Sequence, residues 1–138
     1  MRASISALFL AALVATAVSL GSGTAAAHGK KIQVKLREMS VIPALKSAKA
    51  GWVTFAIRNV GTVDHEFVVA RNDSGGLLPV KKLKAVEDDA LHVDEVEDIV
   101  PGADPRKLSV QLKKGTYVLF CNIPGHYQLG MSIAFKVT

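Results

Sequence analysis

The chain has 138 residues, of which 49% are hydrophobic and 21% are charged, and its formal net charge is +5 at pH 7. A chain of this length forms a single domain with a modest core, and its mild basic excess, without arginine-rich or aromatic-rich clusters, excludes nucleic acid as an expected partner. The single cysteine, Cys121, excludes an intramolecular disulfide and a covalently attached c-type haem, each of which needs two cysteines.

The first 27 residues have the layout of a secretory signal peptide. Arg2 supplies the positive start, Ile5 to Leu20 the apolar run, and Thr24 to Ala27 the small-residue cleavage signal. An uncleaved membrane anchor is the alternative, but sixteen residues diluted by serine and threonine fall short of the roughly 20 that span a bilayer. We therefore predict cleavage after Ala27 and a periplasmic or extracellular protein. Its single domain, 28–138, would have 138 − 27 = 111 residues, and a formal charge of +4 once Arg2 is lost.

Beyond residue 28 the apolar residues alternate with polar ones, which predicts a series of short strands. The first pattern consists of Ile32, Val34 and Leu36. The other expected strands lie at 51–60, 65–71, 107–112, 115–121 and 131–137. Turns rich in glycine, asparagine and proline separate them. Several short strands at this spacing predict an all-β protein, an antiparallel sandwich or barrel.

The stretch from Leu77 to Val100 has no single period. Its apolar residues fit a short helix in the first half and an extended chain in the second. We predict a long connection with a helical turn, which leads into a strand near 91–98; such connections occur in Greek-key sandwiches. The acidic stretch 87–98, which contains His92, fits either a docking patch for a basic partner or, more commonly for a run of charges, a solvated face.

The segment CNIPGHYQLGM holds a thiol, an imidazole and a thioether in Cys121, His126 and Met131. In an oxidising compartment a lone cysteine is expected to be buried or bound. Cys121 ends one expected strand and Met131 opens the next, so the nine-residue loop between them would return the chain beside itself. His126 lies near the apex of this loop, and His65 opens an earlier expected strand. The candidate metal ligands are therefore His65, Cys121, His126 and Met131.

The donor types of this set indicate which metal it would hold. Thiolate and thioether are soft ligands, whereas imidazole suits copper, zinc and iron alike. Zinc sites are built from cysteine, histidine and carboxylate, without a thioether. One thiolate and two imidazoles with a weak axial thioether are typical of blue copper, so the methionine favours copper. Taken singly, the residues also have ordinary interpretations, Cys121 as a small hydrophobe and Met131 as core packing.

Two segments, NVGTVDHEFVV and GTYVLFCNIPGHYQLGM, resemble the signature of the cupredoxin, or type-1 blue copper, family. The resemblance runs from about Lys31 to Thr138, which is nearly all of the chain after the predicted signal peptide. Four residues between cysteine and histidine, and four more before methionine, are similar to the loop of the family's rusticyanin-like bacterial members, whereas plastocyanin loops are shorter. The resemblance implies a Greek-key β-sandwich, one type-1 copper ion and a tyrosine corner at Tyr117. Several members carry asparagine or serine where this chain has Glu66, so the reduction potential does not carry over.

The resemblance further implies a protein that shuttles single electrons between redox partners. A copper carrier or buffer, using the same ligands without a redox role, is the alternative. A copper enzyme would need another histidine-rich site, and only His28 and His92 are left for one, so we expect no enzyme. We expect a monomer, without stable membrane insertion, whose partners dock briefly on an apolar collar around His126. The collar consists of Ile123, Pro124, Tyr127 and Leu129.

Overall fold

The computed structural model describes residues 29–85 and 91–138, so the predicted signal peptide lies outside the described residues. The described residues form strands and turns, and none of them belongs to a helix that could cross a membrane. The strands are β1 (Lys30–Arg37), β2 (Ser40–Pro43), β3 (Ser47–Ala48), β4 (Gly51–Asn59), β5 (His65–Arg71), β6 (Val80–Lys81), β7 (Lys84–Ala85), β8 (His92–Ile99), β9 (Arg106–Leu112), β10 (Gly115–Phe120) and β11 (Ser132–Val137).

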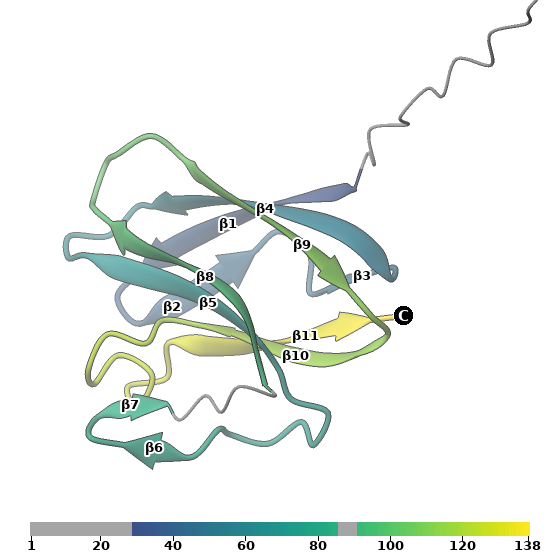
Figure 1. Cartoon of the computed structure of the whole chain (residues 1–138). Coiled ribbons are helices and arrows are strands. Elements are labelled where there is room, and N and C mark those ends of the chain that lie inside the picture. The colour runs from purple at the N-terminus through teal and green to yellow at the C-terminus, as the bar shows by residue number, and fades with distance from the viewer. Residues whose placement is uncertain (1–28, 86–90) are drawn as a thin grey trace, which may run out of the picture.

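Two sheets form a sandwich, which confirms the predicted all-β class (Figure 1). The first has the strand order β2-β1-β4-β9 and the second β3-β11-β10-β5-β8. Most pairs are antiparallel as predicted, but β1 pairs with β4, and β11 with β3, in parallel. The chain reverses after β1 to form β2 and then visits the second sheet as β3, so it re-enters the first sheet as β4 in the direction of β1. The sandwich is therefore mixed, which the alternation of apolar residues could not reveal.

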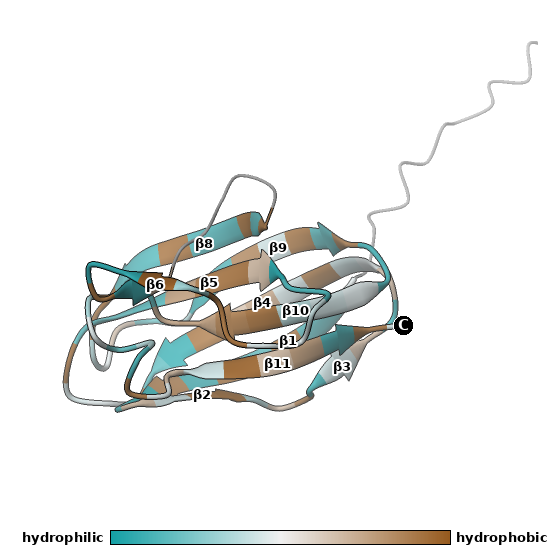
Figure 2. Ribbon diagram, turned by 90° about the horizontal axis from the view of Figure 1, so that it is seen from below, coloured by the Kyte–Doolittle hydropathy of each residue, from teal (hydrophilic) through white to brown (hydrophobic). Residues whose placement is uncertain are grey.

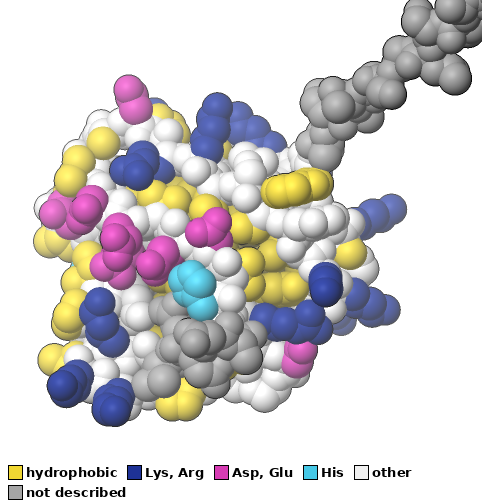
Figure 3. Space-filling model, in the orientation of Figure 1, with side chains coloured by type: hydrophobic (Ala, Val, Ile, Leu, Met, Phe, Trp, Pro, Cys, Tyr) yellow, Lys and Arg dark blue, Asp and Glu magenta, His cyan; other side chains and the backbone are white. Residues whose placement is uncertain are grey.

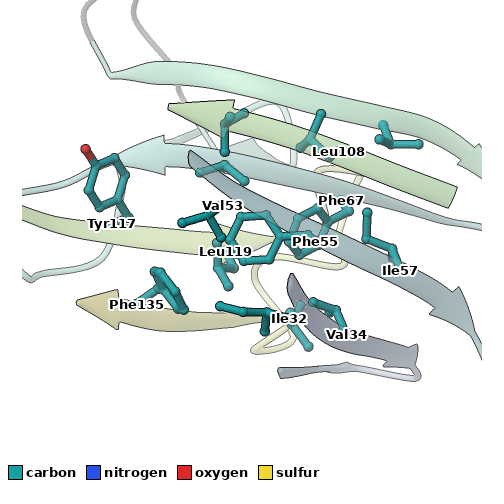
Figure 4. Packing of buried hydrophobic residues seen from close by; sticks show 14 of the residues in the cluster. Ile32, Val34, Val53, Phe55, Ile57, Phe67, Leu108, Tyr117, Leu119 and Phe135 are labelled. Carbon is teal, nitrogen blue, oxygen red and sulfur yellow. The ribbon is translucent and has the colours of Figure 1, made fainter. Parts of the chain in front are cut away.

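The core lies between the two sheets and follows the predicted alternation. Ile32, Val34 and Leu36 of β1 are at most 1% exposed, and bands of alternating hydropathy run along β8 and β9 (Figure 2). At the centre, the Phe55 ring lies 5.3 Å from that of Phe67 and 5.6 Å from that of Phe135, measured between centroids (Figure 4). Tilted and edge-on aromatic pairs at such distances add to the free energy gained from burial alone. The two sheets are thus joined by a rigid centre.

Part of the second sheet, β5 and β10, is buried on its outer face as well. The β6–β7 hairpin and the chain before it cover β5 and β10 there (Figures 1 and 2). The predicted helical turn between 77 and 100 is absent from the described part of that stretch, because Lys82 and Leu83 adopt positive φ angles of 49° and 65° and close a hairpin instead. Residues 86–90 lie outside the described residues. The strand predicted near 91–98 is confirmed as β8.

The predicted tyrosine corner is present in the turn between β9 and β10. The Tyr117 hydroxyl donates to the carbonyl of Lys113 at 2.9 Å and accepts from its N–H at 3.1 Å. This closure fixes where β10 begins. Because β10 is antiparallel to both β5 and β11, the end of β10 meets the starts of these two strands at one end of the sandwich.

Candidate metal centre

Three of the four predicted ligands meet at this end of the sandwich. His65 is the first residue of β5, Cys121 directly follows β10, and His126 lies in the loop between β10 and β11. The Cys121 sulfur is 3.9 Å from Nδ1 of His65 and 3.4 Å from Nδ1 of His126. All three donor atoms lie within 4.8 Å of one another. The strand order thus brings His65 next to Cys121, which lies 56 positions further along the sequence.

The spacing of these atoms fits a metal ion with three equatorial ligands. Bonds of about 2.3 Å to sulfur and about 2.0 Å to nitrogen, at trigonal angles, would hold sulfur and nitrogen about 3.7 Å apart. The two observed separations, 3.4 and 3.9 Å, lie on either side of this value. In these two separations the residues present therefore fit a small metal ion.

His65 is held in a buried position by the turn that precedes it. Its side chain is 0% exposed, and Asn59 braces the turn by donating to the carbonyls of Val63 and Ile99 and accepting from the N–H of Gly61. Burial lowers the pKa of His65 below its ordinary 6.5, and the neighbouring His126 lowers it further, against the opposing effect of Glu38. A neutral imidazole is the form that binds a metal.

Cys121 is also 0% exposed, and its sulfur accepts a hydrogen bond from the backbone N–H of Glu66 at 3.3 Å. Burial raises the pKa of the Cys121 thiol above its ordinary 9.0, while the N–H groups of Glu66 and Ile123 oppose that rise. The thiol is therefore protonated at neutral pH, and a metal that binds here would displace the proton. Although Glu66 departs from the residues common at this position in cupredoxins, its backbone N–H still reaches the sulfur.

Met131 is tied to Cys121 and His126 through the backbone of the loop. Its N–H donates to the carbonyl of His126, and its carbonyl accepts from the N–H of Cys121, both at 3.1 Å. The side chain is 0% exposed and belongs to the main core cluster. The hydrogen bonds close the loop on itself, so Cys121, His126 and Met131 are fixed relative to one another.

The loop is also anchored to the stretch around the β6–β7 hairpin, which the sequence analysis did not predict. Asn122 accepts from the N–H of Ala85 at 2.8 Å and donates to its carbonyl at 3.3 Å. The carbonyl of Leu83 accepts from the N–H of Gly125 at 2.7 Å. An amide directly after the cysteine was the available signal, but its partner 37 residues away in the sequence was not readable.

The predicted apolar collar is only partly present. Pro124 and Leu129 are exposed and Ile123 is half-buried, but the prediction for Tyr127 is wrong, because this residue is only 5% exposed. Its hydroxyl accepts from the N–H of Leu78 at 2.8 Å, and its ring packs edge-on against another aromatic ring of the second sheet. Tyr127 thus supports the loop from beneath.

Comparisons with known protein families and with curated proteins find no match, whereas several solved structures are similar. Rusticyanin from Thiobacillus ferrooxidans has a TM-score of 0.60 and 21% identity, covering 80% of this chain and 79% of its own. Dithionite-reduced auracyanin from Roseiflexus castenholzii has a TM-score of 0.58 and 18% identity, over 80% of this chain and 98% of its own. Auracyanin A from Chloroflexus aurantiacus, described as a "blue" copper protein, has a TM-score of 0.52 and 18% identity, over 78% of this chain and 99% of its own.

These neighbours are cupredoxins, and their similarity to this chain extends over most of the described residues. At such identities the likeness establishes the fold, while the cluster of one cysteine and two histidines is a feature of this chain itself. The chain has the cupredoxin fold, as the resemblance of its sequence implied.

Proposed function

We propose that the protein binds one copper ion and shuttles single electrons between redox partners. The observation that carries this proposal is the cluster of one sulfur and two imidazole nitrogens, whose two sulfur–nitrogen separations fit a trigonal site. Cys121, His65 and His126 would be the equatorial ligands, and Met131 the weak axial one. Bound copper would supply a Cu(I)/Cu(II) couple at this position. The description of auracyanin A as a "blue" copper protein agrees with this assignment.

The rigidity of the donor set favours electron transfer over copper storage. Hydrogen bonds hold the loop at Cys121 and Met131, and Asn59 braces the turn before His65. Ligands that stay in place would let both oxidation states share one geometry, so little reorganisation would accompany transfer. Among the residues that the structure describes, no second set of three close histidine, cysteine or carboxylate donors is found. We therefore propose a carrier and not an enzyme.

The surface around His126 suits brief docking of a redox partner. His126 is half-buried and is the most accessible of the three clustered donors. Leu129 is 68% exposed on the same loop, and Leu83, whose carbonyl binds the loop at Gly125, is 56% exposed. A small apolar patch of this kind, defined by Leu83, Pro124 and Leu129, would allow weak association and quick release. We further propose that residues 1–27 are a cleaved export signal and that the mature protein is a monomer.

Voltammetry of the copper-loaded protein tests the proposed function. We expect a reversible one-electron couple, slow loss of copper to a chelator, and no turnover of oxygen or nitrite. Ready exchange of copper with the chelator and the absence of a reversible couple would instead indicate the copper carrier or buffer. Turnover of either substrate would identify an enzyme.

A further inference from the structure

Glu38, in the turn between β1 and β2, supports the turn that leads into His65. Its Oε1 accepts hydrogen bonds from the backbone N–H of Thr62 at 2.6 Å and of Val63 at 2.9 Å. The approach is so close that a Cβ atom at Gly61 would lie 2.5 Å from the same oxygen. These N–H donors lower the pKa of Glu38 to about 2, so the carboxylate is charged at neutral pH.

The two ring nitrogens of His65 have different surroundings. Nδ1 faces the Cys121 sulfur, whereas Nε2 is buried and finds no hydrogen-bond partner among the described residues. Oε1 of Glu38 lies 3.8 Å from it. Because the pKa of His65 is lowered, this is a neutral ring beside a carboxylate and not an ion pair. A shift of well under 1 Å would bring the two atoms to hydrogen-bond distance.

We propose that Glu38 is a positioning residue for the metal ligand His65, accepting the Nε2–H and leaving Nδ1 free to bind. This inference rests on the proposed copper site. A metal on Nδ1 requires the proton of the neutral ring to sit on Nε2, and a carboxylate on the far nitrogen of a metal-binding histidine fixes that tautomer and makes the ring a stronger donor. The negative charge of Glu38 also stabilises Cu(II) relative to Cu(I), which lowers the reduction potential.

The charge effect is tested by the midpoint potential of the copper-loaded Glu38→Gln variant. The glutamine keeps an oxygen for Thr62 and Val63 but carries no charge, so the potential should rise. The control is Asp94→Asn, which removes one negative charge farther from the copper site. Asp94 pairs with Val69, and Val69 is four residues from His65 along β5, or about 13 Å at ~3.3 Å per residue. A rise in Glu38→Gln that clearly exceeds that of the control supports the proposal. Equal shifts in the two variants would overturn it.

The positioning effect is tested in the metal-free protein by ¹⁵N NMR of the His65 ring. Wild type and Glu38→Gln should show the Nε2–H tautomer, whereas Glu38→Ala, which lacks an acceptor, should show a mixture of tautomers. If the His65 ring of Glu38→Ala shows the same tautomer as the wild type, the positioning role is overturned. If Glu38→Ala does not fold, the proposal is tested by the midpoint potential of Glu38→Gln. Since this measurement involves no copper, failure to load copper would refute the proposed function without deciding the tautomer.

Discussion

Replacing Asn122 by alanine should both destabilise the fold and loosen the metal centre. The change removes the partners of the Ala85 N–H and carbonyl, and Ala85 is only 5% exposed, so water replaces them poorly. An unsatisfied buried N–H costs roughly 1–3 kcal/mol, and we add under about 1 kcal/mol for the longer bond to the carbonyl. We expect the free energy of unfolding to fall by about 2–3 kcal/mol, or the melting temperature by about 8–12 °C at roughly 4 °C per kcal/mol.

The same variant should release copper faster, because the residue after Cys121 is no longer tied to β7. If all the lost free energy appears as opening of the loop, transfer to a chelator would accelerate by up to roughly 150-fold, at about 1.4 kcal/mol for each factor of ten. Asn72→Ala is the matched control, since Asn72 is 7% exposed and its side chain bonds to Gly76 and Ser74 of its own turn. It should lower stability and leave copper release unchanged. A loss below about 0.5 kcal/mol in Asn122→Ala, or release at the wild-type rate, would refute the reasoning.

Three further changes test separate parts of the structure. Met131→Leu conserves volume and should lower the free energy of unfolding by less than about 1.5 kcal/mol. If Met131 is the axial ligand, loss of its thioether should raise the reduction potential of the copper-loaded protein and leave its colour intact. An unchanged potential would mean that Met131 serves only in core packing. Tyr117→Phe leaves the backbone groups of Lys113 without their partner and should cost about 1–2 kcal/mol in urea unfolding, so an unchanged midpoint would contradict the role of the corner. A hydrogen bond from Arg71 holds the pKa of Asp73 below its ordinary 3.8, so the charged Asp73 stabilises the fold above pH 3.8, and this stabilisation is lost as the pH falls through the lowered pKa. Asp73→Asn should therefore lose less stability in acid than the wild type does. Parallel plots of the free energy of unfolding against pH for the two proteins would rule the effect out.

Local alternation was sufficient to predict most of the sandwich. The pattern of Ile32, Val34 and Leu36 corresponds to a strand with one face on the core, and the same alternation of apolar and polar residues identified β9 and β11. Strands β2 and β3 were missed because four and two residues are too few to show a period. The parallel pairing of β1 with β4 depends on the path of the chain between the sheets, which no local pattern encodes.

The hairpin over the second sheet had a signal that was not used. Phe67 to Ala70 and Val118 to Cys121 are unbroken buried runs, and such runs indicate strands covered on both faces. Something had to cover the outer face of β5 and β10, and the chain after β5 was the nearest candidate. Leu78, which precedes the hairpin, and Ala85 of β7 pack on this face.

The candidate metal site was readable because thiol, imidazole and thioether are rare in this chain and fall at strand ends. What surrounds the site was not readable, since Glu38 reaches Thr62 across 24 positions through the packing of two turns. Likewise, the position of Tyr127 in the loop sequence could not show that its side chain is buried. In the described part of the acidic stretch, acidic side chains gather over β8 (Figure 3), and the exposed ones are Asp94, Glu95, Glu97 and Asp98. Their exposure fits a docking patch as well as a solvated face.

Titration of the metal-free protein with Cu(II), followed by visible absorption, tests the central claim most directly. The account predicts an intense blue or green colour that saturates at one copper per chain. It also predicts that Cys121→Ser, which removes the thiolate, abolishes the colour. A colourless copper complex, or a colour that survives in Cys121→Ser, would contradict the assignment of the cluster as a blue copper centre.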